Sequence, residues 1–534
     1  MRSTIFLAKA RGGLMSRLGL VALVLFVIGG LGVFSASAAA TPCTSTDIRW
    51  ASSSNTIYIF GENVVCTLMD IDQLVPKANL ALVNPTEHIW FLGTNLVVQQ
   101  GATLQLHGTS IGGDVDYLRL KSNNTSTTHS IVWIRADWGI IDIDTTKITS
   151  WDEATGETDK EYEQYRRSFI QARSRLALDG VTPNESHMNI KNSEIGYLGY
   201  AGAEAYGLSW KVNGKEENLF DLVNIYGEVI NNRIHHNYFG AYTYGAEGMH
   251  WQGNELDNNV VYGLDPHDNS DNLVIEDNDA HHNGSHGIIC SRFCDHLIIR
   301  NNVARDNGGN GIMLHRLTDF SLIEGNETFN NSDSGIAVFD SHHNTIRGNR
   351  SYGNAKGIRF SVGSSHNLVT ENQIHDNDSY GLYFYQGSDA PTNSGDSGRP
   401  HDNQFINNEV SGSGIYGLKM KETDDNLFQD NHFTDNGRSL LIELSSHNRF
   451  ENNTIEDNSE TGIVLSGASD HELVGNLIEH NGDVGIYLKK ESDNAVITNN
   501  TIRQHNKYGI RVVDSEGVTI EDNIFEDNGQ DISS

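Results

Sequence analysis

Short apolar runs recur along much of the chain in a frame that starts with a glycine. Four consecutive copies span Tyr262–Asp268, His286–Arg292, Asn310–Arg316 and Ser334–Asp340. The first and third positions after the glycine are mostly apolar, whereas the second and fourth positions vary. Side chains alternate between the two faces of a strand, so the apolar positions point inward and the variable positions point outward. Each copy therefore predicts one short strand with a buried face and an outward face.

The interval between these frames is nearly constant, with glycine spacings of 24, 24, 24 and 22 residues from Gly263 to Gly357. Each repeat also has a second apolar run and an asparagine-rich turn, such as Leu273–Asn278. Asparagine tolerates left-handed backbone angles at tight corners, and stacked asparagines can form hydrogen-bonded ladders. A period in the low twenties without helix signals predicts a right-handed parallel β-helix with coils of roughly 22–24 residues. A leucine-rich repeat is the alternative, but its Leu/Asn frame is absent.

The regularity of the repeat divides the chain into three parts. Residues 1–40 have the pattern of a signal peptide. Residues 41–190 are predicted to form N-terminal coils with a cap region. Residues 191–534 are predicted to form the regular repeats that carry the candidate site. The charged stretch Trp151–Arg175 predicts a short helix or an excursion loop. The polar stretch Ser388–His401 interrupts the array and predicts an inserted loop that overhangs the outward face.

The N-terminal segment predicts export from the cytoplasm. Arg11 and Arg17 precede an apolar run, small residues follow it, and either Met1 or Met15 serves as the start. We therefore expect a periplasmic protein, with secretion as an alternative. No later apolar segment is long enough to cross a bilayer, so we expect no stable membrane insertion after signal cleavage.

An exported protein can form disulfides. Cys43 and Cys66 are a plausible pair that would staple the first coil. Cys290 and Cys294 either pair across a strand end, or Cys290 is a small core residue at an inward position. The two pairs are too far apart to suggest a zinc site, and no metal or cofactor is expected.

The charge of the chain limits its partners. With 37 Lys and Arg against 70 Asp and Glu, the formal net charge is −33, which argues against nucleic acid as a partner. The outward face is nevertheless rich in aromatic and basic residues, which suits an extended polyanion with sugar faces and carboxylates. The alternative is that these side chains are only solvated. The candidate substrate-binding residues are Tyr244, His315, Arg316, Phe339, Asp340, Arg359, Tyr383 and Tyr385.

Titratable residues concentrate at one point of this face. Asp265, His267 and Asp268 lie within four residues, and Asp265 and His267 share the outward face. Arg292 lies at the corresponding strand end one coil later. This arrangement indicates a site rather than a core.

The stretch Tyr262–Asp268, followed by Ser291 and Arg292, resembles the periplasmic mannuronan C-5-epimerases of alginate-producing bacteria. The likeness covers roughly residues 100–385. It implies a right-handed β-helix that acts on polymannuronate during alginate maturation, with His267 as the catalytic histidine and Arg292 as the arginine for the substrate carboxylate. An envelope alginate-export complex is a further expected partner.

The chemistry of these residues fits that expectation. A guanidinium on the uronate carboxylate stabilises the charge that develops when the C5 proton leaves. A neutral imidazole can take that proton. Asp265 or Asp268 orients His267, and the sequence does not rank them. Water is the default donor of the returning proton, and Tyr244 and His315 are weaker candidates. A polyuronate lyase, which starts from the same carbanion, and a non-catalytic polysaccharide-binding β-helix are the alternative functions.

Overall fold

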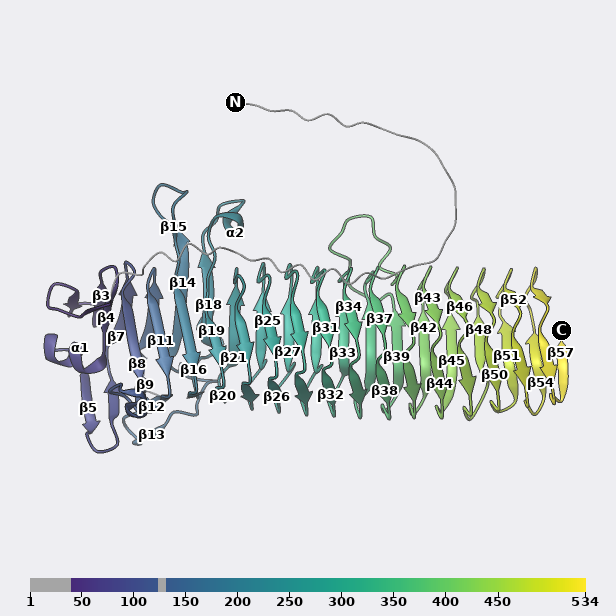
Figure 1. Ribbon diagram of the computed structural model, residues 1–534, viewed down its shortest axis with the longest axis horizontal. Coiled ribbons are helices and arrows are strands. Elements are labelled where there is room, and N and C mark those ends of the chain that lie inside the picture. Colours follow the sequence, from purple (N-terminus) through teal and green to yellow (C-terminus); the bar gives the residue numbers. More distant parts are fainter. Residues whose placement is uncertain (1–39, 123–130) are drawn as a thin grey trace, which may run out of the picture. The chain divides into compact units, whose positions relative to one another are not determined.

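The repeats coil into three parallel sheets whose strands stack one above another (Figure 1). The computed structural model describes residues 40–122 and 131–534. The predicted signal peptide therefore lies almost entirely outside the described residues. Each regular coil contributes one strand to each sheet and pairs in parallel with the next coil, as at Leu264, Ile288 and Ile312. The result is the predicted right-handed parallel β-helix.

The sheet that carries the candidate site is called sheet B. Its strands are β2 (Ile48–Ala51), β3 (Thr56–Phe60), β7 (Asn95–Gln99), β10 (Trp133–Asp137), β14 (Phe169–Leu176), β15 (Pro183–Asn184), β18 (Gly207–Asn213), β21 (Phe239–Tyr244), β24 (Leu264–His267), β27 (Ile288–Ser291), β30 (Ile312–His315), β33 (Ser334–Phe339), β36 (Lys356–Ser361), β39 (Tyr380–Tyr385), β42 (Tyr416–Lys421), β45 (Arg438–Glu443), β48 (Ile463–Ser466), β51 (Val484–Lys489), β54 (Tyr508–Val512) and β57 (Gln530–Ser533).

Sheet A follows sheet B in each regular coil. Its strands are β1 (Thr41–Pro42), β4 (Val64–Cys66), β8 (Thr103–His107), β11 (Ile140–Asp144), β16 (His187–Lys191), β19 (Glu228–Ile230), β22 (His250–Gln252), β25 (Val274–Glu276), β28 (Ile298–Arg300), β31 (Leu322–Glu324), β34 (Thr345–Arg347), β37 (Leu368–Thr370), β40 (Gln404–Ile406), β43 (Leu427–Gln429), β46 (Arg449–Glu451), β49 (Glu472–Val474), β52 (Val496–Thr498) and β55 (Thr519–Glu521).

Sheet C completes each coil and leads into the next strand of sheet B. Its strands are β5 (Leu80–Asn84), β6 (Ile89–Leu92), β9 (Tyr117–Ser122), β12 (Lys147–Asp152), β13 (Glu157–Thr158), β17 (Glu194–Gly196), β20 (Arg233–His235), β23 (Glu255–Asp257), β26 (Asp279–His281), β29 (Val303–Arg305), β32 (Glu327–Phe329), β35 (Arg350–Tyr352), β38 (Gln373–His375), β41 (Glu409–Ser411), β44 (His432–Thr434), β47 (Thr454–Glu456), β50 (Leu477–Glu479), β53 (Thr501–Arg503) and β56 (Ile524–Glu526).

The core confirms the predicted phase of the sheet B strands. Leu264, Ile288 and Leu314 are fully buried inside the coil stack. The repeat glycine is required because the coils approach closely at that position. A Cβ atom on Gly263 would lie 2.5 Å from the carbonyl oxygen of Gly287, a distance that backbone atoms cannot accommodate.

Buried asparagines at the coil corners form the ladders that the sequence predicts. Along one corner, the Asn254 Nδ2 donates to Asn278 Oδ1 at 2.8 Å, and Asn278 repeats this bond to Asn302 at 2.9 Å. Each of these side chains also accepts from a backbone N–H of the previous coil, as Asn278 does from Asn254 at 3.0 Å. These bonds satisfy polar groups that the turn buries and fix the spacing of successive coils.

The N-terminal coils include a short helix, α1 (Leu68–Leu74). Thr67 begins it with a capping box, and Leu68 and Ile71 face the core. The predicted Cys43–Cys66 disulfide is present beside it. Cys290 and Cys294 are buried free thiols, so they do not form the alternative disulfide, and Cys290 is a core residue.

Several excursions leave the coils. They include the 3₁₀ turn η1 (Thr109–Ile111), the β14–β15 hairpin, the loop with α2 (Leu219–Leu222) and the inserted loop after β39. In Figure 1 the last three protrude on the same side of the stack. Within Trp151–Arg175 the structure has strands and an irregular excursion instead of a helix. In the described ranges, no helix is both long enough and apolar enough to span a membrane.

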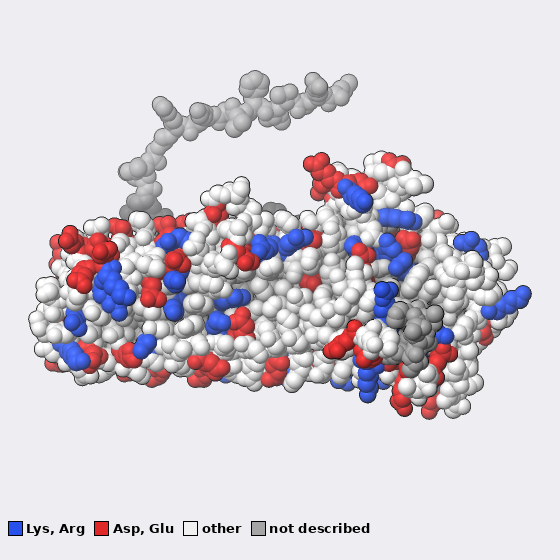
Figure 2. Space-filling view, turned by 180° about the vertical axis from the view of Figure 1, so that it is seen from behind, with Lys and Arg blue, Asp and Glu red and all other residues white. Residues whose placement is uncertain are grey.

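Charged side chains on the outer surface pair between neighbouring coils. Arg438 Nε lies 2.7 Å from Glu460 Oε2, and Arg305 Nη2 lies 2.8 Å from Asp279 Oδ2. On the face shown in Figure 2, basic residues accordingly stand among acidic ones. Exposed pairs of this kind contribute little stability each, about 0–1 kcal/mol.

Substituting Leu314 with aspartate should unfold the coils around β30. The side chain is fully buried, so the variant loses apolar packing worth about 2–5 kcal/mol and buries an unpaired charge. Leu444→Asp is the matched control, because Leu444 is 52% exposed. Thermal unfolding followed by circular dichroism checks this, and equal melting temperatures for the two variants would contradict the observed strand phase.

Candidate active site

A cleft of about 670 Å³ opens on the outer face of sheet B, across strands β21, β24, β27 and β30. It contains the predicted cluster and a set of aromatic residues. The lining residues are Tyr206, Phe239, Tyr242, Tyr262, Asp265, His267, His286, Ile289, Ser291, Arg292, Met313, His315 and Arg316.

Asp268 holds both of the predicted catalytic side chains. Its two carboxylate oxygens accept from Arg292 Nε and Nη2, each at 2.8 Å, and its Oδ2 lies 3.1 Å from His267 Nδ1. Burial opposes ionisation of Asp268, but the contact with His267 and the hydrogen bonds from Arg292 outweigh it and keep its pKa below the usual value. Asp268 is therefore the carboxylate that orients His267, an assignment that the sequence left open between Asp265 and Asp268.

The sequence predicts that Asp265 faces solvent together with His267, but the structure buries Asp265. Its side chain lines the cleft but is only 1% exposed, whereas the His267 side chain is 29% exposed. Burial raises the pKa of Asp265 to about 7, against the weaker opposing effects of His267 and Ser291. This burial was not evident from the sequence, because the covering side chains come from neighbouring coils.

The aromatic wall of the cleft is not among the features predicted from the sequence. Tyr206, Phe239, Tyr262 and His286 each stand at or immediately before the start of a repeat frame. The rings of Tyr206 and Phe239 stack with centroids 4.4 Å apart, and those of Tyr262 and His286 are 5.4 Å apart. The run of aromatic residues at this one repeat position, directly before the glycine, is the signal that could have identified them.

Two further histidines line the cleft in neutral form. Burial lowers the pKa of both His286 and His315 to about 4, with nearby arginines adding to the effect. His315 is therefore not an acid of matched pKa at neutral pH. Tyr244 lies beside His267, and the centroids of the two rings are 6.4 Å apart. The ammonium of Lys211 lies 4.9 Å from the Tyr244 ring centroid.

The predicted substrate-binding residues fall into groups along sheet B. His315 and Arg316 line the cleft, and the Phe339 ring lies 4.8 Å from the His315 ring. The remaining members of the outward set lie one or more coils farther along, and Arg359 Nη1 donates there to the Tyr385 hydroxyl at 3.0 Å. That second group is made up of Arg359, Tyr383 and Tyr385.

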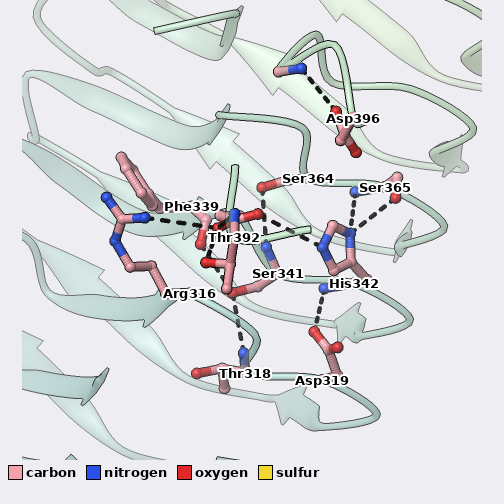
Figure 3. Close-up of polar contacts among 12 residues, drawn as sticks. Arg316, Thr318, Asp319, Phe339, Ser341, His342, Ser364, Ser365, Thr392 and Asp396 are labelled. Carbon is pink, nitrogen blue, oxygen red and sulfur yellow. Dashed lines mark hydrogen bonds and ion pairs between the residues drawn. The ribbon is translucent and has the colours of Figure 1, made fainter. Parts of the chain in front are cut away.

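Asp340 does not face outward as predicted. It is fully buried, and its Oδ2 accepts from the Thr392 backbone N–H at 2.8 Å and from the Thr392 hydroxyl at 2.6 Å. Thr392 of the inserted loop is labelled in Figure 3. The reason is the inserted loop, which folds back over the strand end and covers this carboxylate. Asp340 therefore anchors the loop instead of binding substrate.

The same loop reaches the rim of the cleft. Asp389 accepts from Arg316 Nη2 at 2.9 Å, and the Arg316 guanidinium lies 5.1 Å from the Phe339 ring centroid. The loop thus neutralises an arginine that lies one coil beyond Arg292. This confirms that the insertion overhangs the outward face.

The backbone is left-handed at the strand ends that carry the charged residues of the site. Asp268, Arg292 and Arg316 have φ values of 26°, 72° and 57°. Left-handed angles recur at corners all along the coil stack, for example at Asp277 and Asn452, so they belong to the repeat and do not by themselves mark the site. Here the same corner recurs in consecutive coils and presents one carboxylate and two guanidinium groups in a row.

A group with the composition of a metal site lies elsewhere. Ligand atoms of His366, His401 and Asp402 lie within 4.8 Å of one another at a corner of the coil stack. His401 already contacts two carboxylates, with Asp402 Oδ2 at 2.7 Å and Asp396 Oδ2 at 3.5 Å. None of these residues lines the cleft.

Comparisons with known families agree with this architecture. Residues 394–532 match the model of the right handed beta helix region, and residues 202–379 and 289–414 match that of the periplasmic copper-binding protein (NosD). A mannuronan C5-epimerase of Pseudomonas aeruginosa is 28% identical over 44% of this chain and 39% of its own length. Mannuronan C5-epimerase AlgG of Azotobacter vinelandii is 29% identical over 61% of this chain and 59% of its own length. The chain thus spans less than two thirds of these curated relatives.

A solved structure supports the fold over a longer stretch. The crystal structure of the periplasmic alginate epimerase AlgG superimposes with a TM-score of 0.61 and 22% identity, covering 72% of this chain and 86% of the other. The fold, the cleft and the sequence similarity thus agree with the resemblance of the Tyr262–Asp268 stretch. The chain is thus similar in sequence to mannuronan C5-epimerases and similar in fold to the periplasmic alginate epimerase AlgG.

Proposed function

We propose that the protein is a mannuronan C5-epimerase, which converts β-D-mannuronate to α-L-guluronate residues within polymannuronate. The observation that carries this proposal is the Asp268 carboxylate, which fixes a histidine and an arginine side by side at the mouth of a cleft. The similarity to curated epimerases supports the same reaction.

Arg292 is suited to bind the carboxylate of the reacting uronate. Asp268 uses the Nε hydrogen and one Nη2 hydrogen of the guanidinium. An arginine has five N–H donors, so three remain for the substrate. The Arg292 side chain is 49% exposed and therefore accessible. Binding there neutralises the carboxylate and stabilises the enolate-like charge that forms when C5 loses its proton.

His267 is suited to take the C5 proton. Its Nδ1 faces Asp268, which leaves Nε2 as the nitrogen that can act as base toward the cleft. The Asp268 carboxylate stabilises the imidazolium that results. The C5–H bond breaks, its electron pair passes into the carboxylate-stabilised anion, and the proton moves to His267.

Epimerisation is complete when a proton returns to C5 from the opposite face of the sugar. The low pKa of His315 leaves it without an acidic proton at neutral pH. Water is therefore the proposed donor. The 4-O-glycosidic bond stays intact in this reaction, in contrast to the elimination that a lyase would catalyse.

We propose a periplasmic location for the reaction, as expected from the N-terminal segment. The superimposed AlgG is itself a periplasmic alginate epimerase, which supports this location. The polymer then meets the enzyme after it has left the cytoplasm. An envelope alginate-export complex as a partner remains a prediction.

Removing the base or the carboxylate-binding arginine should abolish guluronate formation. His267→Ala and Arg292→Ala are expected to lower the rate by about 10²–10⁴-fold, because each deletes a group that acts in the transition state. Proton NMR of polymannuronate incubated with each purified protein measures the product. Circular dichroism should show an intact β-helix, since both side chains are partly exposed and leave no cavity.

His447→Ala is the matched control, because His447 is 61% exposed in the C-terminal coils. It should retain wild-type turnover. Undiminished guluronate formation by His267→Ala would refute the assignment of the base.

The buried Asp265 should make the free energy of unfolding depend on pH. Its carboxyl is protonated in the folded state up to about pH 7 but ionises near pH 3.8 in the unfolded chain. Between these values the folded state binds more protons, so the contribution of Asp265 to the free energy of unfolding falls as pH rises. A neutral carboxyl also avoids repelling an anionic substrate from the cleft.

Asp265→Asn should therefore be more stable than the wild type at pH 8, by up to about 4 kcal/mol, and should differ little at about pH 4. Denaturant unfolding at both pH values measures the difference between the two proteins. Asp483→Asn, at a 52% exposed carboxylate, is the control. An Asp265→Asn protein that is less stable than the wild type at pH 8 would show that the carboxylate is ionised and bonded in the folded state.

A further inference from the structure

A second pocket lies on the other side of the turns that build the cleft. It has a volume of about 430 Å³ and is formed where sheet C leads into sheet B. His236 and His282 come from the first residues after β20 and β26, and Tyr197 comes from the same position after β17. The excursion between β13 and β14 closes the pocket with Lys160 and Tyr162.

The two pockets share short stretches of chain. His236 lines the second pocket, and Phe239, three residues later, lines the cleft. The next two coils repeat this relation, with Val260 two residues before Tyr262 and Gly284 two residues before His286. The second pocket therefore adjoins the aromatic wall of the cleft.

Tyr238 joins the two pockets through ring contacts. Its ring centroid lies 6.3 Å from that of Tyr162 in the second pocket. On the other side it lies 5.5 Å from the Phe239 ring and 6.3 Å from the Tyr206 ring, both of which line the cleft. Consecutive aromatic faces thus lead from one pocket to the other, and such faces offer apolar contact area for the faces of sugar rings.

The second pocket also carries positive charge in a strongly acidic protein. Arg167 is 1% exposed and donates to the carbonyl oxygens of Gly199 at 2.9 Å and Leu198 at 3.1 Å. Burial lowers the pKa of Arg167 to about 10, so it stays charged at neutral pH, and the neighbouring Asp159 offsets that charge. Lys160 is exposed and forms no ion pair with any described residue, so its ammonium is the group available to a carboxylate.

We propose that this pocket is a distal subsite that binds a second uronate unit of the polymer whose reacting unit occupies the cleft. Lys160 binds the carboxylate of that unit, and Tyr162 and Tyr238 contact the sugar rings. The pocket serves binding and not chemistry, because His236 Nδ1 is bonded to His235 Nδ1 at 2.9 Å and not directly to a carboxylate, as His267 is to Asp268. This inference rests on the proposed function, since it concerns the same polymer.

The subsite is tested by how affinity depends on chain length. Oligomannuronates of increasing length are titrated into the His267→Ala protein, which binds without turnover, and into the same protein with Lys160→Ala and Tyr162→Ala. Loss of one exposed ion pair and one aromatic contact should reduce the affinity for long oligomers about tenfold and leave that for the shortest oligomers nearly unchanged. Lys507→Ala in the C-terminal coils is the matched control. It should keep the full gain in affinity with oligomer length.

If Tyr162→Ala disturbs the excursion, Lys160→Ala alone still tests the subsite. The Lys160 side chain is exposed, so its removal should leave the fold intact. An unchanged gain in affinity with length in the Lys160→Ala variant would overturn the distal subsite while leaving the proposed function intact. A protein with wild-type His267 that binds and epimerises no oligomannuronate would overturn both.

Discussion

The register between successive coils is the constraint on which the rest of the structure depends. Backbone pairing places residues about 24 positions apart next to each other, and His267, Ser291 and His315 form one row on sheet B for this reason. Asparagine ladders at the corners hold the same spacing. The bidentate contact between Asp268 and Arg292 exists only in this register. A shift of one residue would turn both side chains away and bring core residues to the surface.

Ion pairing positions the guanidinium groups that would meet an anionic polymer in the proposed function. Arg292 is held by Asp268, and Arg316 is held by Asp389 of the inserted loop. These carboxylates keep the guanidinium groups in place before substrate arrives, which lowers the cost of ordering them on binding. The buried Asp265 contributes in another way, since its raised pKa leaves it partly protonated at neutral pH and so reduces the negative charge in the cleft. In the proposed function, these features let the site accept a polyanion although the whole chain is strongly acidic.

The sequence was sufficient for the fold, and it brought together the residues of the candidate site, because both follow from local patterns. The repeat period and the alternation of apolar residues predicted the coils, and the cluster of Asp265, His267 and Asp268 with Arg292 predicted the site. What the sequence could not supply was the environment of each side chain. The burial of Asp265 depends on side chains from other coils, and that of Asp340 depends on a loop that returns from β39. The choice of Asp268 as the orienting carboxylate depends on the geometry of the strand end.

Proton exchange at C5 without chain cleavage is the central step of the proposed reaction. The most direct measurement is NMR and size analysis of polymannuronate incubated with the wild-type protein in heavy water. We predict deuterium at C5 of the new guluronate residues, because the returning proton comes from solvent, with the chain length unchanged. Accumulation of 4,5-unsaturated chain ends at the rate of C5 proton loss would contradict this prediction and would identify a lyase.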